Sequence, residues 1–121
     1  MTTLAIGAVA ERTGLTVSAV RYYDDIAMIS AIERVGGKRR FAEETVGRVN
    51  FIRRSQSAGF SLDEIRGLLD ESNRGWRTSV DDKIAELTER RHQLDEMLDL
   101  LGNMRDCGCA VIAQCPRTIA C

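Results

Sequence analysis

The chain has 121 residues, enough for one compact domain with an appendage but not for two full domains. Hydrophobic residues make up 44% of it and charged residues 29%, as in soluble globular proteins, and a single proline favours long helices. No apolar run approaches the roughly 20 residues that a membrane helix needs. The N-terminal segment lacks the apolar core of a secretory signal, so we expect a cytoplasmic protein.

The net charge of −1 hides an uneven distribution. Residues 1–60 carry 9 Lys and Arg against 6 Asp and Glu, whereas residues 61–121 carry 8 against 12. The basic excess is densest at Lys38-Arg39-Arg40, with Arg34 just before it. DNA binding requires a local positive surface rather than a basic whole, so the first half of the chain is compatible with it.

Two helices are predicted near the N-terminus. Leu4, Ile6, Val9 and Ala10 follow helical spacing within residues 4–13, and Gly14 can end that helix. Thr16 is a favourable N-cap for a second helix over residues 16–26. Two helices joined by a short turn that contains glycine predict a helix-turn-helix, whose second helix enters the major groove of DNA.

The next segments complete a small domain. Residues 27–41 contain β-branched residues and Gly36-Gly37, which predicts a two-stranded wing with a tight turn. Residues 42–58 predict a third helix, and Ser61 opens a fourth with a sequence close to a capping box. Residues 72–78 are the one stretch that resembles a linker.

A heptad pattern marks residues 79–105. Apolar residues recur every seven positions, Arg91 interrupts the intervening row, and the helix would be roughly 40 Å long. Such a stripe cannot be buried along its whole length against a domain of this size, so a second copy of the chain is the expected partner. The alternative is a helix that folds back on its own domain. The predicted interface consists of Val80, Ile84, Leu87, Leu94, Leu98 and Leu101.

Four cysteines, Cys107, Cys109, Cys115 and Cys121, lie within the last fifteen residues. Disulfides that stabilise a small secreted fold are spread through it, so this cluster indicates metal ligands or redox-active thiols. Thiolates favour soft metal ions, but an iron–sulfur cluster or an oxidisable thiol remains open. His92, the one histidine, is interpreted as a solvated or interface side chain.

The candidate DNA-contacting residues lie on the second helix and the wing. Arg21 can bind guanine or a phosphate, and the hydroxyls of Tyr22 and Tyr23 can reach the DNA backbone. The wing residues suit phosphates outside the central groove. The full set is Thr16, Val17, Ser18, Arg21, Tyr22, Arg34, Lys38, Arg39 and Arg40.

The sequence also resembles the MerR-type regulators. The resemblance covers about residues 4 to 105 and rests on IGAVAERTGLTVSAVRYYDD (6–25), MISAIERVGGKRRF (28–41) and VNFIRRSQSAGFSLDEIRGLL (49–69). It implies a winged helix-turn-helix, a homodimer joined by an antiparallel coiled coil, and a ligand site at the end of the dimer helix. It also implies binding to promoters with an over-long spacer, which are bent and untwisted so that RNA polymerase can engage.

The same resemblance suggests roles for single residues. Arg21, Tyr22 and Arg40 match characteristic DNA-contacting positions, and Ala27 stands where relatives usually carry glycine. Cys107, Cys109 and Cys115 fit three of the four cluster ligands of SoxR-type redox sensors, with Met104 at the fourth. Cys107 to Cys115-Pro116 also has the spacing of copper-type sensors. Ser79 occupies the position at which sensors of divalent metals carry cysteine, which disfavours mercury, zinc and lead.

Together these observations predict a mostly α-helical fold. Its parts are a winged helix-turn-helix domain (1–72), a dimerisation helix (79–105) and a cysteine-rich C-terminal loop (106–121). The predicted function is DNA-binding transcriptional regulation in response to a thiophilic metal ion, with [2Fe–2S] or redox sensing as the alternative. A cysteine-rich metal-binding or redox protein with no DNA role is the alternative of another class. An enzyme is not expected, because a Gly-rich phosphate loop and a catalytic histidine are lacking.

Overall fold

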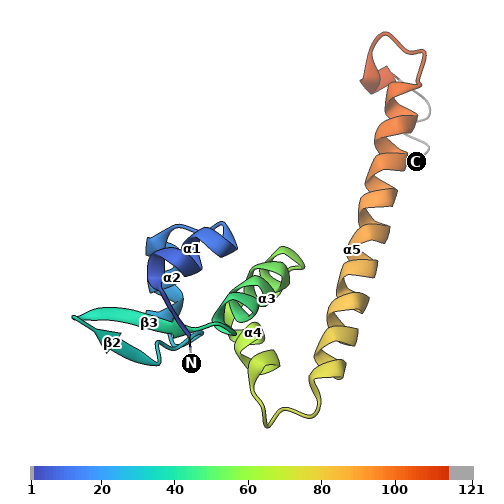
Figure 1. The fold of residues 1–121 in the computed structure, drawn as a ribbon. Coiled ribbons are helices and arrows are strands. Elements are labelled where there is room, and N and C mark those ends of the chain that lie inside the picture. The colour runs from blue at the N-terminus through green and yellow to red at the C-terminus, as the bar shows by residue number, and fades with distance from the viewer. Residues whose placement is uncertain (1, 115–121) are drawn as a thin grey trace. The chain divides into compact units, whose positions relative to one another are not determined.

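The computed structural model describes residues 2–114 and is mostly helical (Figure 1). The elements in chain order are β1 (Thr3–Ala5), α1 (Ile6–Thr13), α2 (Val17–Asp25), β2 (Glu33–Val35), β3 (Lys38–Ala42), α3 (Thr45–Ser57), α4 (Leu62–Leu69), α5 (Trp76–Arg105) and the short 3-10 helix η1 (Ile112–Gln114). The chain divides into an N-terminal unit, residues 1–76, and a C-terminal unit, residues 77–121. No helix among the described residues is long and apolar enough to cross a membrane.

The predicted helix-turn-helix is confirmed as α1 and α2. Gly14 ends α1 in the left-handed conformation with a φ of 72°, which costs glycine little because it lacks a Cβ atom. Thr16 caps α2, since its hydroxyl oxygen accepts a hydrogen bond from the Ala19 amide at 3.1 Å. The turn between the helices therefore follows from residues that the sequence places at its two ends.

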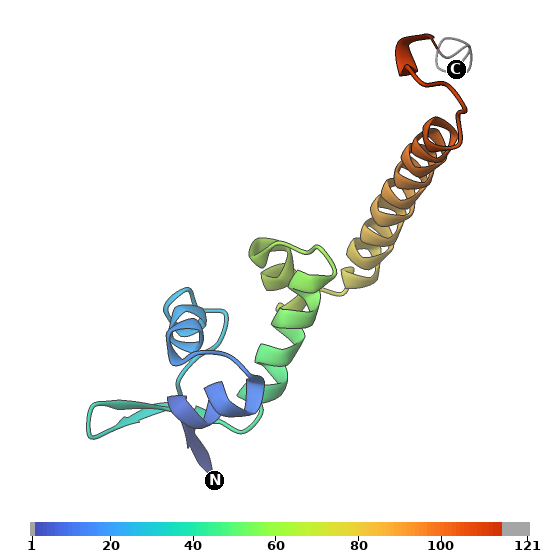
Figure 2. The same cartoon turned by 90° about the horizontal axis from the view of Figure 1, so that it is seen from above.

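The sheet differs from the prediction. Gly36 and Gly37 have φ values of 58° and 78°, as a tight type I′ turn requires, and the β2–β3 hairpin projects from the helices (Figures 1 and 2). However, the sheet has three antiparallel strands in the order β1-β3-β2, with Leu4 opposite Phe41. The predictions that the first helix starts at residue 4 and that the wing has only two strands are therefore wrong. A strand of three residues is too short to show an alternating pattern.

The N-terminal unit has its own hydrophobic core. Phe41 on β3 is fully buried and belongs to one core cluster with apolar residues from α1 to α4. Ser61 and Glu64 form the capping box expected at the start of α4, which directs Ile65 into the core. The core residues are Val9, Ala10, Val20, Tyr23, Met28, Ile29, Phe41, Val49, Ile52 and Ile65.

The C-terminal unit contains most of α5, a helix of 30 residues that begins at Trp76, three residues before the predicted start. Its heptad residues are mostly exposed, from 37% at Leu87 to 64% at Leu98. The structure contains a single copy of the chain, so the coiled coil stays a prediction.

Candidate DNA interface and cysteine segment

The exposed face of α2 carries most of the predicted recognition residues. Val17, Ser18, Arg21 and Tyr22 are all exposed, whereas Val20 on the same helix is fully buried. Residues four apart lie on one face of a helix, so Val17 with Arg21 and Ser18 with Tyr22 form one continuous surface. Helix α2 therefore has one exposed, partly polar face and one face that packs on the core.

Tyr23 is the exception to the predicted pattern. Its side chain is 9% exposed and belongs to the core, and its hydroxyl lies 3.0 Å from Oε1 of Gln56 on α3. The prediction that the Tyr23 hydroxyl reaches DNA is therefore wrong. Two consecutive residues of a helix point about 100° apart, so Tyr22 faces solvent while Tyr23 anchors α2 to α3.

A basic groove lies beside α2. Its charged lining residues are all basic, and they come from α2 and from both strands of the β2–β3 hairpin. The groove thus brings together four of the predicted DNA-contacting residues that are up to 18 positions apart in the sequence. The lining residues are Ala5, Ile6, Gly7, Arg21, Arg34, Gly37, Lys38 and Arg39.

The N-terminus of α1 opens into the same groove through Ile6 and Gly7. The N-cap residue is Ala5, which makes no side-chain hydrogen bond to the first turn. The first amides of a helix carry a partial positive charge and lack partners within the helix. These amides add to the positive potential of Arg21, Arg34 and Lys38, which suits a phosphate group.

Arg40 joins the first strand to the rest of the sheet. Its Nε donates to Oγ1 of Thr3 at 3.0 Å, and its Nη2 donates to the Thr3 carbonyl at 2.8 Å. The side chain is partly buried. A guanidinium has five N–H groups, so these two bonds fix its orientation and still leave donors for another acceptor. The sequence showed no sign of this role, because β1 was not predicted.

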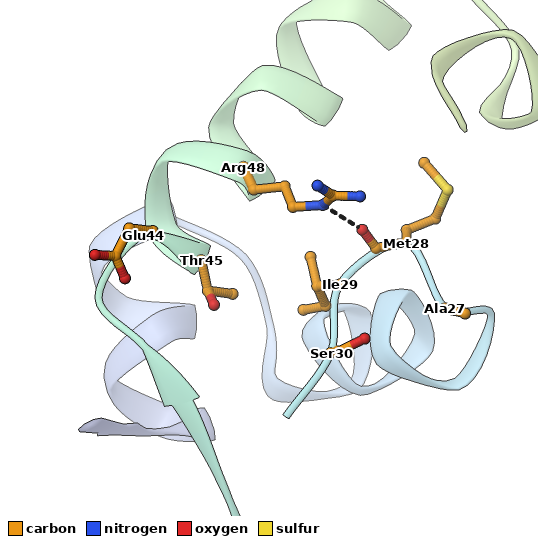
Figure 3. Close-up of a pocket in the computed structure, with 7 residues that line it drawn as sticks. All are labelled: Ala27, Met28, Ile29, Ser30, Glu44, Thr45 and Arg48. Atoms are coloured by element: carbon orange, nitrogen blue, oxygen red, sulfur yellow. Dashed lines mark hydrogen bonds between the residues drawn. The ribbon is translucent and has the colours of Figure 1, made fainter. Parts of the chain in front are cut away.

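The turn that follows α2 is held from two other helices. Arg48 on α3 donates from Nε to the Met28 carbonyl at 2.7 Å, beside a small pocket that Ser30, Glu44 and Thr45 also line (Figure 3). Arg66 on α4 donates to the Ile26 carbonyl at 2.7 Å. Carbonyls at a helix C-terminus lack partners within the helix and are stabilised by cations, so Arg66 caps α2 while Arg48 holds the turn that follows it.

Ala27 in this turn has a φ of 61°, a left-handed conformation that is unfavourable for residues with a Cβ atom. Its place in the turn is visible in Figure 3. This is the position at which the resemblance expected glycine. Ala27 thus adopts a backbone conformation that glycine would adopt at lower cost, and the fold absorbs the resulting strain.

The cysteine segment follows the end of α5. Cys107 is partly buried, and its amide donates to the Met104 carbonyl at 3.3 Å, while Cys109 is exposed with a free thiol. Cys115 and Cys121 lie outside the described residues. Within residues 2–114, no group of three or more potential ligand residues could hold a metal ion. Cys107 is disulfide-bonded in this structure, so only its reduced form could join Cys109 in binding a soft metal ion.

His92 lies on α5, away from this segment. Its Nε2 is 3.3 Å from Oε1 of Glu96, and both side chains are mostly exposed. Such a pair is typical of the solvated surface of a helix.

Comparison with known proteins identifies the family. The model described as "MerR HTH family regulatory protein" matches residues 4–72, and the model described as "MerR, DNA binding" matches residues 46–104. The chain belongs to the MerR family. It is a MerR-type transcriptional regulator with a DNA-binding domain.

This MerR-family chain is similar to two regulators that carry different names. The HTH-type transcriptional activator SoxR homolog of Chromobacterium violaceum is 33% identical over 121 residues, covering 93% of this chain and 81% of the relative. The regulator HmrR of Rhizobium leguminosarum bv. viciae is 37% identical over 117 residues, covering 84% of this chain and 91% of the relative.

A solved structure agrees with the fold. The regulator PbrR691 from Ralstonia metallidurans, in complex with lead(II), matches with a TM-score of 0.70 and 26% identity. The match covers 97% of this chain and 98% of that structure.

Proposed function

We propose that this MerR-type regulator reads promoter DNA with the exposed face of α2 and grips the flanking phosphates with the basic groove. The observation that carries the proposal is that Arg21, Arg34 and Lys38 line one groove beside the exposed face of α2. Thr16, Val17, Ser18 and Tyr22 supply the remaining contacts of the recognition helix, and Arg40 supplies a wing contact. Such an arrangement combines base readout with phosphate contacts.

The regulator acts as a homodimer joined by an antiparallel coiled coil of α5. Support comes from the exposed apolar side chains at Ile84, Leu94, Leu98 and Leu101, which are between 51% and 64% exposed in a single copy. A helix of about 45 Å that carries such a stripe gains most from an identical helix. A dimer would present two copies of α2 to DNA, which allows the protein to bend and untwist a promoter with an over-long spacer.

The signal in this proposal is a thiophilic metal ion bound by Cys107, Cys109, Cys115 and Cys121. The short spacing of Cys107 and Cys109 just beyond α5 supports it, as does the lead(II) complex of a structural neighbour. A redox signal through a [2Fe–2S] cluster is the second candidate, favoured by the match to a SoxR homologue. Either group would use thiolates as ligands, so the disulfide at Cys107 must be reduced before the group binds.

A binding assay tests the DNA interface. A duplex that the wild-type chain selects from a random pool serves as the probe. Arg21→Ala is expected to cost about 1–3 kcal/mol of binding free energy and to relax sequence preference. Arg90→Ala, on the exposed surface of α5, removes the same charge at a residue that does not line the groove and should bind as the wild type does. Equal affinities of the two variants would contradict the proposed interface.

A spectrum and a metal analysis test the sensor. The protein is purified anaerobically and titrated with copper(I) and zinc(II), with Cys107→Ser/Cys109→Ser as the matched variant. Metal binding that is lost in the variant supports the metal sensor. Visible charge-transfer bands with bound iron and sulfide would favour the cluster instead. A colourless protein without metal affinity would contradict both.

A further inference from the structure

Arg39 lies on the wing but forms ion pairs with the recognition helix. Its Nη1 is 3.0 Å from Oδ2 of Asp24, and its Nη2 is 3.1 Å from Oδ1 of Asp25. These carboxylates belong to the last two residues of α2. The Nη1 atom is buried, and the Arg39 side chain as a whole is 20% exposed. Both terminal nitrogens are therefore within ion-pair distance of protein carboxylates, although Nη1 makes no hydrogen bond and other atoms of the side chain line the basic groove.

Asp24 extends this link to the turn after α2. Its Oδ1 accepts a hydrogen bond from the Ala31 amide at 3.2 Å, while its Oδ2 pairs with Arg39. One carboxylate thus ties the end of α2, the chain that leads to β2, and β3. Among the described residues, Arg39 is the one basic side chain that pairs with these acids, and it thereby links the hairpin to α2.

Electrostatics explain why this arginine is needed. Carboxylates at a helix C-terminus are unfavourable because the helix dipole is negative there, and these two would also repel a DNA backbone in the adjacent groove. In the sheet, Arg39 is directly opposite Arg34, where two like charges destabilise a strand pair. The acids of α2 neutralise Arg39, which leaves the charge of Arg34 for the groove.

We propose that Arg39 is a positioning residue, which sets the angle between the wing and the recognition helix and takes no phosphate itself. The inference rests on the DNA-binding mode proposed above. Lys38 is its natural contrast, because it is the neighbouring residue on the same strand and is exposed. A phosphate contact and a positioning contact differ in the salt dependence of DNA binding, since only the former releases counterions.

The experiment measures the dissociation constant for the selected duplex across a series of KCl concentrations. Lys38→Ala should make the slope of log association constant against log [KCl] less steep by about 1 per subunit, or about 2 for the dimer. Arg39→Ala should weaken binding roughly tenfold, as expected for one member of an ion-pair network, and leave the slope unchanged. Arg39→Lys should resemble Arg39→Ala, because an ammonium cannot span two carboxylates as the guanidinium fork does. Circular dichroism and thermal unfolding of each variant confirm that the DNA affinities compared are those of folded proteins.

A second set of variants tests the link directly. In an Asp24→Asn/Asp25→Asn background, adding Arg39→Ala should cost much less affinity than it costs in the wild type. A slope that is less steep by about 1 per subunit for Arg39→Ala, or an equal cost of Arg39→Ala in both backgrounds, would make Arg39 a phosphate contact and overturn the inference. An unchanged affinity for Arg39→Ala would overturn it as well. Failure of the wild type to select any duplex would instead refute the proposed function, and the inference with it.

Discussion

The two units of the chain treat their apolar residues in opposite ways. In the N-terminal unit, Phe41, Ile52 and Ile65 are completely buried by neighbours from the same chain. In the C-terminal unit, Leu98 and Leu101 are 64% and 58% exposed. The hydrophobic effect acts on both, but only the first unit has enough elements to cover its own surface. The second unit needs another surface, and α5 has the pattern of a helix that pairs with its own copy.

The largest effect is expected from a variant that disrupts the apolar face of α5. Leu94→Glu/Leu98→Glu should convert the dimer into a monomer, because charged residues cannot be buried in a coiled-coil seam without a partner. Sedimentation equilibrium measures the mass. The monomer should also bind the selected duplex much more weakly, since it loses the gain of binding through two linked sites.

Asn103→Glu is the control for this experiment. It adds a negative charge to α5 at an exposed position outside the heptad row. A dimer in the control and a monomer in the double variant would support the interface. A double variant with the mass of the wild type would exclude this face as the site of self-association.

The next effect concerns the unit that has its own core. Phe41→Ala should lower the free energy of unfolding by about 3–5 kcal/mol, because it leaves a cavity between β3 and the helices. Urea denaturation followed by circular dichroism measures it. Phe51→Ala, at a residue that is 42% exposed, removes the same atoms and should cost clearly less. Similar losses in the two variants would contradict a core centred on Phe41.

A smaller change in the free energy of unfolding, in the stabilising direction, is expected at Ala27. Ala27→Gly should raise the free energy of unfolding by roughly 0.5–1 kcal/mol, because glycine accepts the positive φ that strains alanine, and this gain exceeds the added entropy of the unfolded chain. Thermal unfolding at a fixed protein concentration measures the change. A lower stability of the variant would show that the turn held by Arg48 and Arg66 carries no strain at Ala27.

The smallest expected effect concerns Asp70, which follows α4 in the N-terminal unit. Hydrogen bonds from the side chain and the amide of Ser72 lower the pKa of Asp70. A lowered pKa means that these bonds stabilise the fold above the ordinary carboxyl pKa, and that this contribution is lost as the pH falls through the lowered value. Ser72→Ala should therefore raise the pKa of Asp70 towards its ordinary value. NMR titration of the Asp70 carboxyl carbon measures it, and an unchanged pKa would assign the shift to another cause.

Local signals explain how much of the fold could be predicted. Gly14, Thr16, Gly36-Gly37 and Ser61 act within a few residues of their own positions, so the turns and caps that they form were predictable. Strand β1 escaped prediction because its stability comes from Phe41 and Arg40, which lie far away in the sequence. The same reason applies to Tyr23, whose burial depends on contact with α3.

The candidate DNA interface also has parts that local sequence predicts and parts that depend on distant contacts. The sequence by itself determined the exposed face of α2, because residue type and helical spacing suffice to place Arg21 and Tyr22 on one surface. Only the tertiary structure decided how the basic run of the wing is used. Lys38 faces solvent, Arg39 forms ion pairs with the end of α2, and Arg40 holds β1. Three adjacent basic residues look equivalent in a sequence. The carboxylates that pair with Arg39 and the carbonyl that accepts from Arg40 are brought to them only by the fold.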